Sequence, residues 1–173
     1  MTDGDRPRLV QLHPYDPAWP AMFERERDII VAALGDEAAQ VDHTGSTSVP
    51  GLTAKPIIDI TLSVRDIDDE STYLPQLEAA GYGFILREPD WFRHRLFQRP
   101  PRMVNLHVFE AGCSEVSAMT GFRDWLRTHP DDRELYERTK RELAERDWTE
   151  VQDYADAKTD VVTEIKRRAG LVD

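Results

Sequence analysis

The sequence predicts an α+β fold, with a small mixed β-sheet, flanking helices and a C-terminal helical lobe. Three observations support this class: a helical pattern opens the chain, strand-like segments are confined to residues 38–110, and charged and apolar residues recur at helical spacing over residues 114–170. With 173 residues, 40% of them apolar, the chain is long enough to bury the core of one domain. We therefore expect a single domain over residues 9–173, preceded by a disordered polar segment at residues 1–8.

The first elements are expected to be a short strand and one long helix. Leu9–Leu12 has the apolar content of a short strand. Asp16 is a typical N-cap residue, and Pro17 suits the first position of a helix. Apolar residues then recur at helical spacing up to Gly35, where the predicted helix ends.

The central segment carries the remaining predicted strands. Gln40–His43 and Pro56–Val64 have strand composition, and a loop of small residues joins them. The pattern of Asp66–Ala80 indicates a helix between strands. A third strand and the two arms of a hairpin are expected at Gly81–Leu86, Trp91–Gln98 and Met103–Glu110.

The segment after Ser114 is expected to form about three helices, broken at residues 128–130 and near residues 147–148. Two tyrosine–lysine pairs in this segment have i, i+4 spacing, so each pair shares a helix face. The pairs are Tyr136 with Lys140 and Tyr154 with Lys158. If they face a cleft, the lysines can bind phosphate and the tyrosines can pack on a base; otherwise they are ordinary surface residues of amphipathic helices.

Charge and cysteine content limit the classes of function. Against 33 acidic residues there are 22 basic ones, a formal net charge of −11, which argues against broad nucleic-acid binding through phosphate neutralisation. Cys113 is the only cysteine, so an intramolecular disulfide is excluded and a reducing compartment is expected. The N-terminal residues lack an apolar signal core, and no segment has membrane-span length. We expect a cytoplasmic protein that does not contact a membrane; the sequence leaves its oligomeric state open.

The loop at residues 43–52, His-Thr-Gly-Ser-Thr-Ser-Val-Pro-Gly-Leu, is a candidate phosphate site. A turn containing Gly45 and Ser46 exposes backbone N–H groups and a hydroxyl, which suits a polyphosphate. Thr47 and the basic Lys55 lie close by in the sequence, and His43 can either orient an acid or contact a phosphate. The alternative is that the hydroxyl residues only cap a short helix.

Asp59 comes after this loop and follows apolar residues on the second predicted strand. We expect it to be buried among Ile57, Ile58, Ile60 and Leu62. A carboxylate is costly there unless it is paired, hydrogen-bonded or bound to a metal. Asp59 is therefore our candidate metal ligand and catalytic residue; otherwise it accepts hydrogen bonds from the loop hydroxyls.

The last predicted strand and the hairpin add further candidates. Alternation places Asn105, His107 and Phe109 on one strand face. His107 can act as a general base or as a metal ligand, unless it is only bonded to a backbone carbonyl. On the other arm, alternation places Arg93 and Arg95 on a shared face, where they can bind phosphates or form a solvated sheet edge.

Several of these motifs together resemble the GrpB family, over nearly the whole chain. The matching residues are Tyr15-Asp16-Pro17-x-Trp19, the segment from His43 to Leu52 with Ala54 to Ile60, His107-Val108, Phe122-Arg123-Asp124-x-Leu126-Arg127 and Tyr154-x-x-x-Lys158. The resemblance implies a nucleotidyltransferase-like fold, in which a Gly-Ser turn and a strand acid hold a nucleoside triphosphate. It also implies a link to dephospho-CoA kinases, to which relatives are fused. Thr61 departs from the superfamily pattern, because active members commonly have a second acid at that position.

Together these features predict a metal-dependent nucleotidyltransferase that transfers an NMP group from an NTP to a small-molecule acceptor. Asp59 and His107 would hold Mg²⁺ or Mn²⁺ and take part in catalysis. Binding of the phosphates is expected from His43, Gly45, Ser46, Thr47, Lys55, Arg93, Arg95 and Lys158. One alternative is an inactive nucleotide- or CoA-binding accessory module of the same fold, which Thr61 favours. Another is an interaction protein whose acidic surface binds a basic partner.

Overall fold

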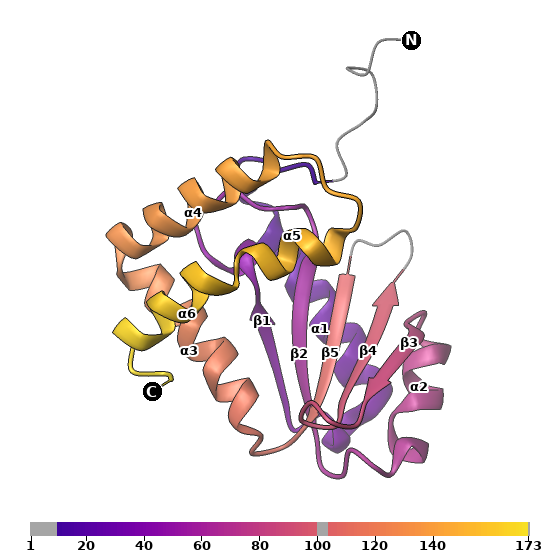
Figure 1. Cartoon of the computed structure of the whole chain (residues 1–173). Coiled ribbons are helices and arrows are strands. Elements are labelled where there is room, and N and C mark those ends of the chain that lie inside the picture. The colour runs from indigo at the N-terminus through magenta and orange to yellow at the C-terminus, as the bar shows by residue number, and fades with distance from the viewer. Residues whose placement is uncertain (1–9, 100–103, 173) are drawn as a thin grey trace.

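A five-stranded mixed sheet forms the centre of the computed structural model, which describes residues 10–99 and 104–172 (Figure 1). The strand order is β1-β2-β5-β4-β3, with β2 and β5 parallel and the other neighbours antiparallel. This arrangement confirms the predicted α+β class with a mixed sheet. The strands are β1 (Gln40–Thr44), β2 (Ile58–Val64), β3 (Gly83–Glu88), β4 (His94–Arg99) and β5 (Val104–Glu110).

The helices lie on both sides of this sheet (Figure 1). α1 lies behind the sheet and α2 beside β3, whereas α3 to α6 lie on the other side and around one end of the strands. The α-helices are α1 (Trp19–Leu34), α2 (Leu74–Ala79), α3 (Ser114–Thr128), α4 (Pro130–Ala144), α5 (Val151–Ala157) and α6 (Thr159–Arg168). Short 3-10 helices occur at Gly35–Glu37, Ser46–Ser48 and Glu70–Thr72.

The main core lies between the sheet and helices α1 and α2. Alternate residues of β2, including Ile58, Ile60 and Leu62, are fully buried in this core. Asp59 points to the opposite face, as alternation along a strand requires, and 30% of its side chain is exposed. The expectation that Asp59 is buried among these apolar residues is therefore wrong, because a strand separates them onto two faces.

A second apolar cluster joins the helical lobe to the loop between β1 and β2. Val49 and Leu52 of the loop are fully buried, and they pack with Leu126 of α3, Tyr136 of α4 and Ile165 of α6. The lobe thereby holds the loop against the end of the sheet. At the other end of α4, Tyr154 of α5 packs in a third, smaller cluster.

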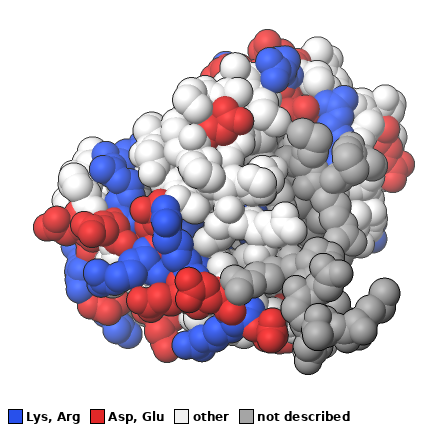
Figure 2. Space-filling model, turned by 90° about the horizontal axis from the view of Figure 1, so that it is seen from above, with Lys and Arg blue, Asp and Glu red and all other residues white. Residues whose placement is uncertain are grey.

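Acidic and basic side chains alternate on the surface of the helical lobe. Figure 2 shows the two signs interspersed on the side of α4 and α6. For example, Arg168 forms ion pairs with both Asp132 and Glu164. On this part of the surface, the excess of acidic residues is therefore not gathered into one acidic patch.

Two predicted helices have different limits in the structure. α1 begins at Trp19 rather than Pro17, because Asp16 Oδ1 accepts a hydrogen bond from the Ala18 N–H (2.8 Å) in a turn that precedes the helix. Of the helix predicted over Asp66–Ala80, only α2 is an α-helix. Side chains before it bond the local backbone instead, as Asp66 Oδ1 does with the Asp68 N–H (3.0 Å).

Three further expectations are corrected. Val10 to Leu12 is not a strand, and the nearest pairing is an isolated bridge between His13 and Ala54; Leu9 lies outside the described residues. β4 begins at His94 rather than Trp91, because Phe92 and Arg93 turn the chain with φ of 53° and 52°. The described part of the segment after Ser114 contains four α-helices, since α5 and α6 separate at Lys158. Of the hairpin, residues 100–103 lie outside the described chain.

No helix in the parts of the chain covered by the structure is both long and apolar enough to cross a membrane.

Candidate functional site

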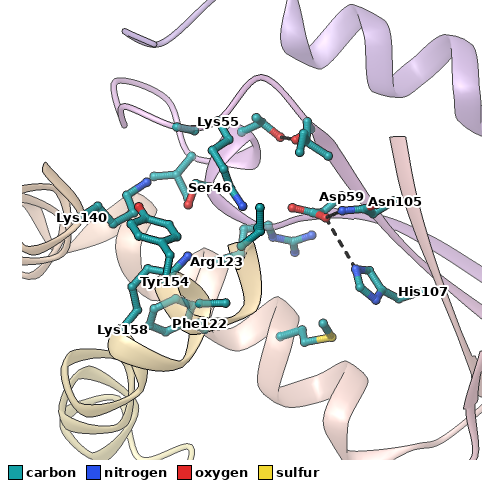
Figure 3. A pocket seen from close by; sticks show the side chains of 18 of the residues that line it. Ser46, Lys55, Asp59, Asn105, His107, Phe122, Arg123, Lys140, Tyr154 and Lys158 are labelled. Carbon is teal, nitrogen blue, oxygen red and sulfur yellow. Dashed lines mark hydrogen bonds and ion pairs between the residues drawn. The ribbon is translucent and has the colours of Figure 1, made fainter. Parts of the chain in front are cut away.

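A cavity of about 510 Å³ lies where the polar face of the sheet meets the loop and the helical lobe (Figure 3). Its walls come from the loop at Gly45–Thr47, from β2, β4 and β5, and from helices α3, α4 and α5. Asp59, Asn105 and His107 form its sheet side, and Lys55, Lys140 and Lys158 its lobe side. We refer to it as the central cavity.

Gly45 sets the distance between the loop and Asp59. Its φ of 70° and ψ of −176° are open to glycine but not to residues with a Cβ atom. A Cβ atom at this position would lie 2.5 Å from Asp59 Oδ2 and 2.9 Å from Asp59 Cβ. The Ser48 hydroxyl donates to the Gly45 carbonyl (2.5 Å), which fixes the short helical turn that follows. The loop thus meets the carboxylate at van der Waals contact, as the glycine-serine turn predicted.

Asp59 has two polar neighbours from β5. Asn105 Nδ2 donates to Asp59 Oδ1 (3.3 Å), and His107 Nε2 lies 3.5 Å from the same oxygen. The parallel register of β2 and β5 brings these side chains together, because Asp59 lies opposite Asn105 and Thr61 opposite His107. Leu106 and Val108 are buried in the main core, so the face predicted for Asn105 and His107 is confirmed.

His43 positions the loop instead of lining the cavity. Its ring stacks on Phe23 with centroids 4.9 Å apart, and its Nε2 lies 2.9 Å from Thr47 Oγ1. Thr47 donates its hydroxyl proton to the Ile57 carbonyl (3.2 Å), so His43 Nε2 is the donor to Thr47. Burial lowers the pKa of His43 to about 4, so the ring is neutral. His43 is neutral and enclosed, and its Nε2 proton is donated to Thr47. It therefore does not make the contact with a phosphate that was expected from the sequence.

Two arginines of α3 bind the carbonyl groups of the loop region. Arg123 Nη1 donates to the His43 carbonyl (3.1 Å), and Arg127 donates to the Ser48 carbonyl through Nε (3.0 Å) and Nη2 (2.8 Å). Arg123 also lines the central cavity. These contacts explain why Arg123 and Arg127 occur together on one helix face: they attach α3 to both ends of the loop.

Three lysines from different elements converge on the central cavity (Figure 3). The sequence contains four lysines in all, and Lys55, Lys140 and Lys158 are three of them. Lys140 is 2% exposed and donates to the Thr53 carbonyl. The Tyr154 ring lies under two of these ammonium groups, 4.7 Å from Lys158 Nζ and 5.6 Å from Lys55 Nζ. Tyr136 lines the central cavity as well, so both tyrosine–lysine pairs face it.

In the described part of the chain, these lysines form no direct ion pair. Among residues 10–99 and 104–172, no carboxylate oxygen lies within 4.0 Å of their ammonium groups. Burial and the neighbouring Lys158 and Lys55 lower the pKa of Lys140 to about 7, against the opposing effect of Glu137. Burial also lowers the pKa values of Lys55 and Lys158, and Asp59 opposes the shift in both. Buried ammonium groups with lowered pKa values are stabilised by an anion, so the cavity favours an anionic ligand.

This arrangement predicts that affinity for inorganic tripolyphosphate depends on pH. Below about pH 7 Lys140 is protonated and available to the anion, whereas above it a proton must be taken up on binding. Between about pH 6 and pH 8.5 the wild-type affinity should fall up to about thirty-fold more than that of Lys140→Met. Isothermal titration calorimetry measures the affinity of both proteins at each pH. Because the ligand titrates in the same way with both, the ratio of the two affinities removes its contribution. Parallel pH profiles for the two proteins would contradict the assignment.

Arg93 and Arg95 do not reach the central cavity. Arg93 lies in the turn before β4 and pairs with Asp68 (2.6 Å) and Glu110 (3.0 Å). Arg95 is 7% exposed and lies on the face of β4 that also buries Phe97. It donates to the Arg93 carbonyl (2.6 Å). The prediction of a shared strand face is wrong, because Arg93 precedes the strand, and both arginines belong to an ion-pair network away from the cavity.

A divalent cation would find few protein ligands in the cavity. Within the described chain, no group of three His, Cys, Asp or Glu side chains lies close enough to hold a metal by itself. Asp59 and His107 provide two donors, and a substrate phosphate and water would have to supply the rest. Thr61, where a second acid could stand, is fully buried, and its hydroxyl lies 2.9 Å from that of Thr44.

Comparisons with known proteins cover nearly the whole chain. The family described as GrpB protein matches residues 9–168. A UPF0157 protein of Halalkalibacterium halodurans is 56% identical over 160 residues, which make up 92% of this chain and 82% of that protein. The crystal structure of the conserved protein GrpB from Enterococcus faecalis matches with a TM-score of 0.82 and 29% identity, over 92% of this chain and 96% of that chain.

A more distant similarity concerns a larger protein. A dephospho-CoA kinase of Mycolicibacterium paratuberculosis is 30% identical over an alignment of 186 positions. The alignment covers 92% of this chain but only 46% of the kinase. This chain therefore corresponds to about half the length of that relative.

Proposed function

Because this chain belongs to the GrpB protein family and has three lysines and a carboxylate lining one cavity, we propose that it is a nucleotidyltransferase. It binds the triphosphate of a nucleotide in the central cavity and transfers the NMP group to a small acceptor with the help of a divalent cation. The observation that carries this proposal is the convergence of Lys55, Lys140 and Lys158 beside Asp59.

The lysines and the loop have distinct tasks in binding. A triphosphate carries several negative charges, and three ammonium groups together with the Arg123 guanidinium offset them. The backbone after Gly45 turns through the short helix Ser46–Ser48, whose first N–H groups suit a phosphate oxygen. The aromatic ring of Phe122 and the side chain of Met119 line the same cavity and offer apolar surface to a base.

In the transfer step, an acceptor oxygen attacks the α-phosphorus, the new P–O bond forms and pyrophosphate leaves. Bound Mg²⁺ or Mn²⁺ would neutralise charge that develops on the phosphates. Asp59 and His107 are the residues that would hold this ion. The Asp59 carboxylate, which has a second oxygen, also opens onto the cavity and is placed to accept the proton of the acceptor hydroxyl.

The binding half of this proposal predicts that Lys140→Met and Lys158→Met each weaken binding of a non-hydrolysable ATP analogue. A charge-assisted hydrogen bond contributes about 1.5–3 kcal/mol, so each change should cost about ten-fold to one-hundred-fold in affinity. Isothermal titration calorimetry on the full chain measures the effect. Lys166→Met on α6 is the matched control, since Lys166 does not line the central cavity. Wild-type affinity in both cavity variants would rule out this mode of binding.

A second candidate function has one structural observation in its favour. Thr61 is buried and occupied in a hydroxyl pair with Thr44, so the position of a second metal-binding acid is filled by a structural residue. The chain could therefore be a nucleotide- or CoA-binding module without transfer activity. The relative named dephospho-CoA kinase supports this reading, since this chain matches only part of it. Pyrophosphate release from the four NTPs, with cell extract as the source of acceptor, separates the two functions: release supports transfer, and tight binding without release supports the module.

A further inference from the structure

Four side chains from four strands form a chain of contacts that ends in the central cavity. Glu88 Oε2 lies 3.2 Å from His94 Nδ1, and His94 Nε2 lies 3.0 Å from His107 Nδ1. His107 Nε2 in turn lies 3.5 Å from Asp59 Oδ1. Both nitrogens of both imidazoles are therefore engaged, between a carboxylate at each end.

These contacts need more protons than two neutral histidines carry. A carboxylate only accepts hydrogen bonds, and a neutral imidazole donates one and accepts one. Three consecutive contacts require three protons, whereas His94 and His107 supply two when both are neutral. One of the three contacts must then consist of a lone pair that faces a carboxylate or the other ring.

The burial of the four groups determines which contact lacks the proton. The His94 side chain is 5% exposed and packs against the rings of Trp91 and Phe109, whose centroids each lie 5.0 Å from its own. The contact of His94 Nδ1 with Glu88 Oε2 (3.2 Å) has hydrogen-bond geometry, and because a carboxylate only accepts, His94 supplies the proton. His107 Nε2 and Asp59 Oδ1 lie farther apart, at 3.5 Å. The His107 and Asp59 side chains are 21% and 30% exposed and open onto the cavity, where water or an ion can lie between them.

We propose that Glu88 and His94 are positioning residues that hold the proton of His107 on Nδ1, so that the Nε2 lone pair and the Asp59 carboxylate form a two-donor cation site. His94 Nδ1 donates to Glu88, and His107 Nδ1 donates to His94 Nε2. The 3.5 Å between Nε2 and Oδ1 permits one ion to contact both, because donors about 2.1 Å from a common ion lie at most about 4.2 Å apart. The role of the bound ion rests on the proposed function, whereas the position of the proton does not.

This arrangement also determines which ions the site prefers. Imidazole nitrogen is a poorer ligand for Mg²⁺ than for Mn²⁺ or Zn²⁺. A histidine whose lone pair is aimed at the carboxylate therefore shifts the preference of the site from Mg²⁺ towards Mn²⁺. A carboxylate partner that orients a metal-binding histidine through its other nitrogen is common; here a second histidine lies between them.

The position of the proton is measured on the metal-free full chain by two-bond ¹H–¹⁵N correlation spectra, above the ordinary histidine pKa of about 6.5. With five histidines in the chain, the signals of His107 are assigned from their loss in His107→Gln. We expect His107 to carry its proton on Nδ1 in the wild type and to lose this preference in His94→Phe, which keeps an aromatic ring packed against Trp91 and Phe109. A wild-type His107 with its proton on Nε2 would overturn the proposal.

The consequence for the ion is measured by electron paramagnetic resonance titration of MnCl₂ with a non-hydrolysable ATP analogue present. His94→Phe and Glu88→Ala should each weaken Mn²⁺ binding about ten-fold to one-hundred-fold, as removal of an orienting partner does. Glu88→Ala retains both histidines, so it tests the relay even if the ring substitution disturbs packing. Asp90→Ala, an exposed acid two residues beyond Glu88, is the control and should bind Mn²⁺ as the wild type does.

Failure of this inference and failure of the proposed function give different results. If the wild type binds no Mn²⁺ while His107 carries its proton on Nδ1, the metal-dependent function is refuted and the positioning role stands. If Mn²⁺ binds and supports transfer but both variants bind it as tightly as the wild type, the positioning role is refuted and the function stands.

Discussion

Replacement of Asp59 by asparagine is expected to lower nucleotidyl transfer about a thousand-fold. The substitution keeps the shape of the side chain and its close approach to Gly45, but it removes the one carboxylate that the described residues place in the cavity. A cation that stabilises transferred phosphate contributes several kcal/mol, and a loss of about 4 kcal/mol corresponds to this factor. Release of pyrophosphate from an NTP, at saturating nucleotide, measures the change.

The matched control is Asp66→Asn, beyond the other end of β2. Asp66 is an exposed residue whose carboxylate accepts a hydrogen bond from Asp68 within the same turn. Its replacement should leave turnover unchanged. If Asp59→Asn binds nucleotide equally well with and without Mn²⁺ and turns over at the wild-type rate, Asp59 has no part in the reaction.

Gly45→Ala should destabilise the protein by about 4 kcal/mol. A residue with a Cβ atom at φ 70° and ψ −176° costs about 1–3 kcal/mol in the backbone, and forced overpacking costs a similar amount, about 1–3 kcal/mol. The added methyl would lie 2.5 Å from Asp59 Oδ2, so either the loop or the carboxylate must move. The variant should therefore also lose nucleotide binding when it is folded. Urea denaturation followed by circular dichroism measures the free energy of unfolding.

A second glycine separates the two causes. Gly51 in the same loop also has a positive φ, of 82°, but a Cβ atom there would meet no atom within 4 Å. Gly51→Ala should therefore cost only the backbone part, about 1–2 kcal/mol. Equal costs for the two variants would mean that the contact between the loop and Asp59 does not constrain the fold.

Much of the fold follows from local sequence patterns. The β-branched content of residues 56–64 predicted β2, but the prediction placed Asp59 among Ile58, Ile60 and Leu62, although their alternation requires Asp59 to face the other way. Alternation along β5 likewise places His107 on the strand face opposite to that of the buried Leu106 and Val108. The predicted ends of the helices were less accurate. An acidic side chain such as that of Asp66 can accept a hydrogen bond from a nearby backbone N–H group, which then makes no helical hydrogen bond.

The site was predicted in part, because contacts between distant segments are not encoded in local periodicity. Gly45 follows Thr44, which pairs with Asp59 in the antiparallel register of β1 and β2, so this pairing brings Gly45 and Asp59 together. Lys140, by contrast, reaches the cavity only because Tyr136 of α4 packs with Val49 and Leu52 of the loop. Its sequence pattern equally fits a surface lysine. Arg93 departs from the prediction because it lies in a left-handed turn, a conformation that its residue type does not indicate.

The central claim is that a nucleoside triphosphate occupies the cavity between Asp59 and the three lysines. A crystal structure of the full chain, grown with Mn²⁺ and a non-hydrolysable ATP analogue, tests it most directly. We predict that the phosphates lie within hydrogen-bond distance of Lys55, Lys140 and Lys158, with the ion on Asp59 and His107. An analogue bound elsewhere, or a cavity that stays empty at saturating analogue, would contradict this account.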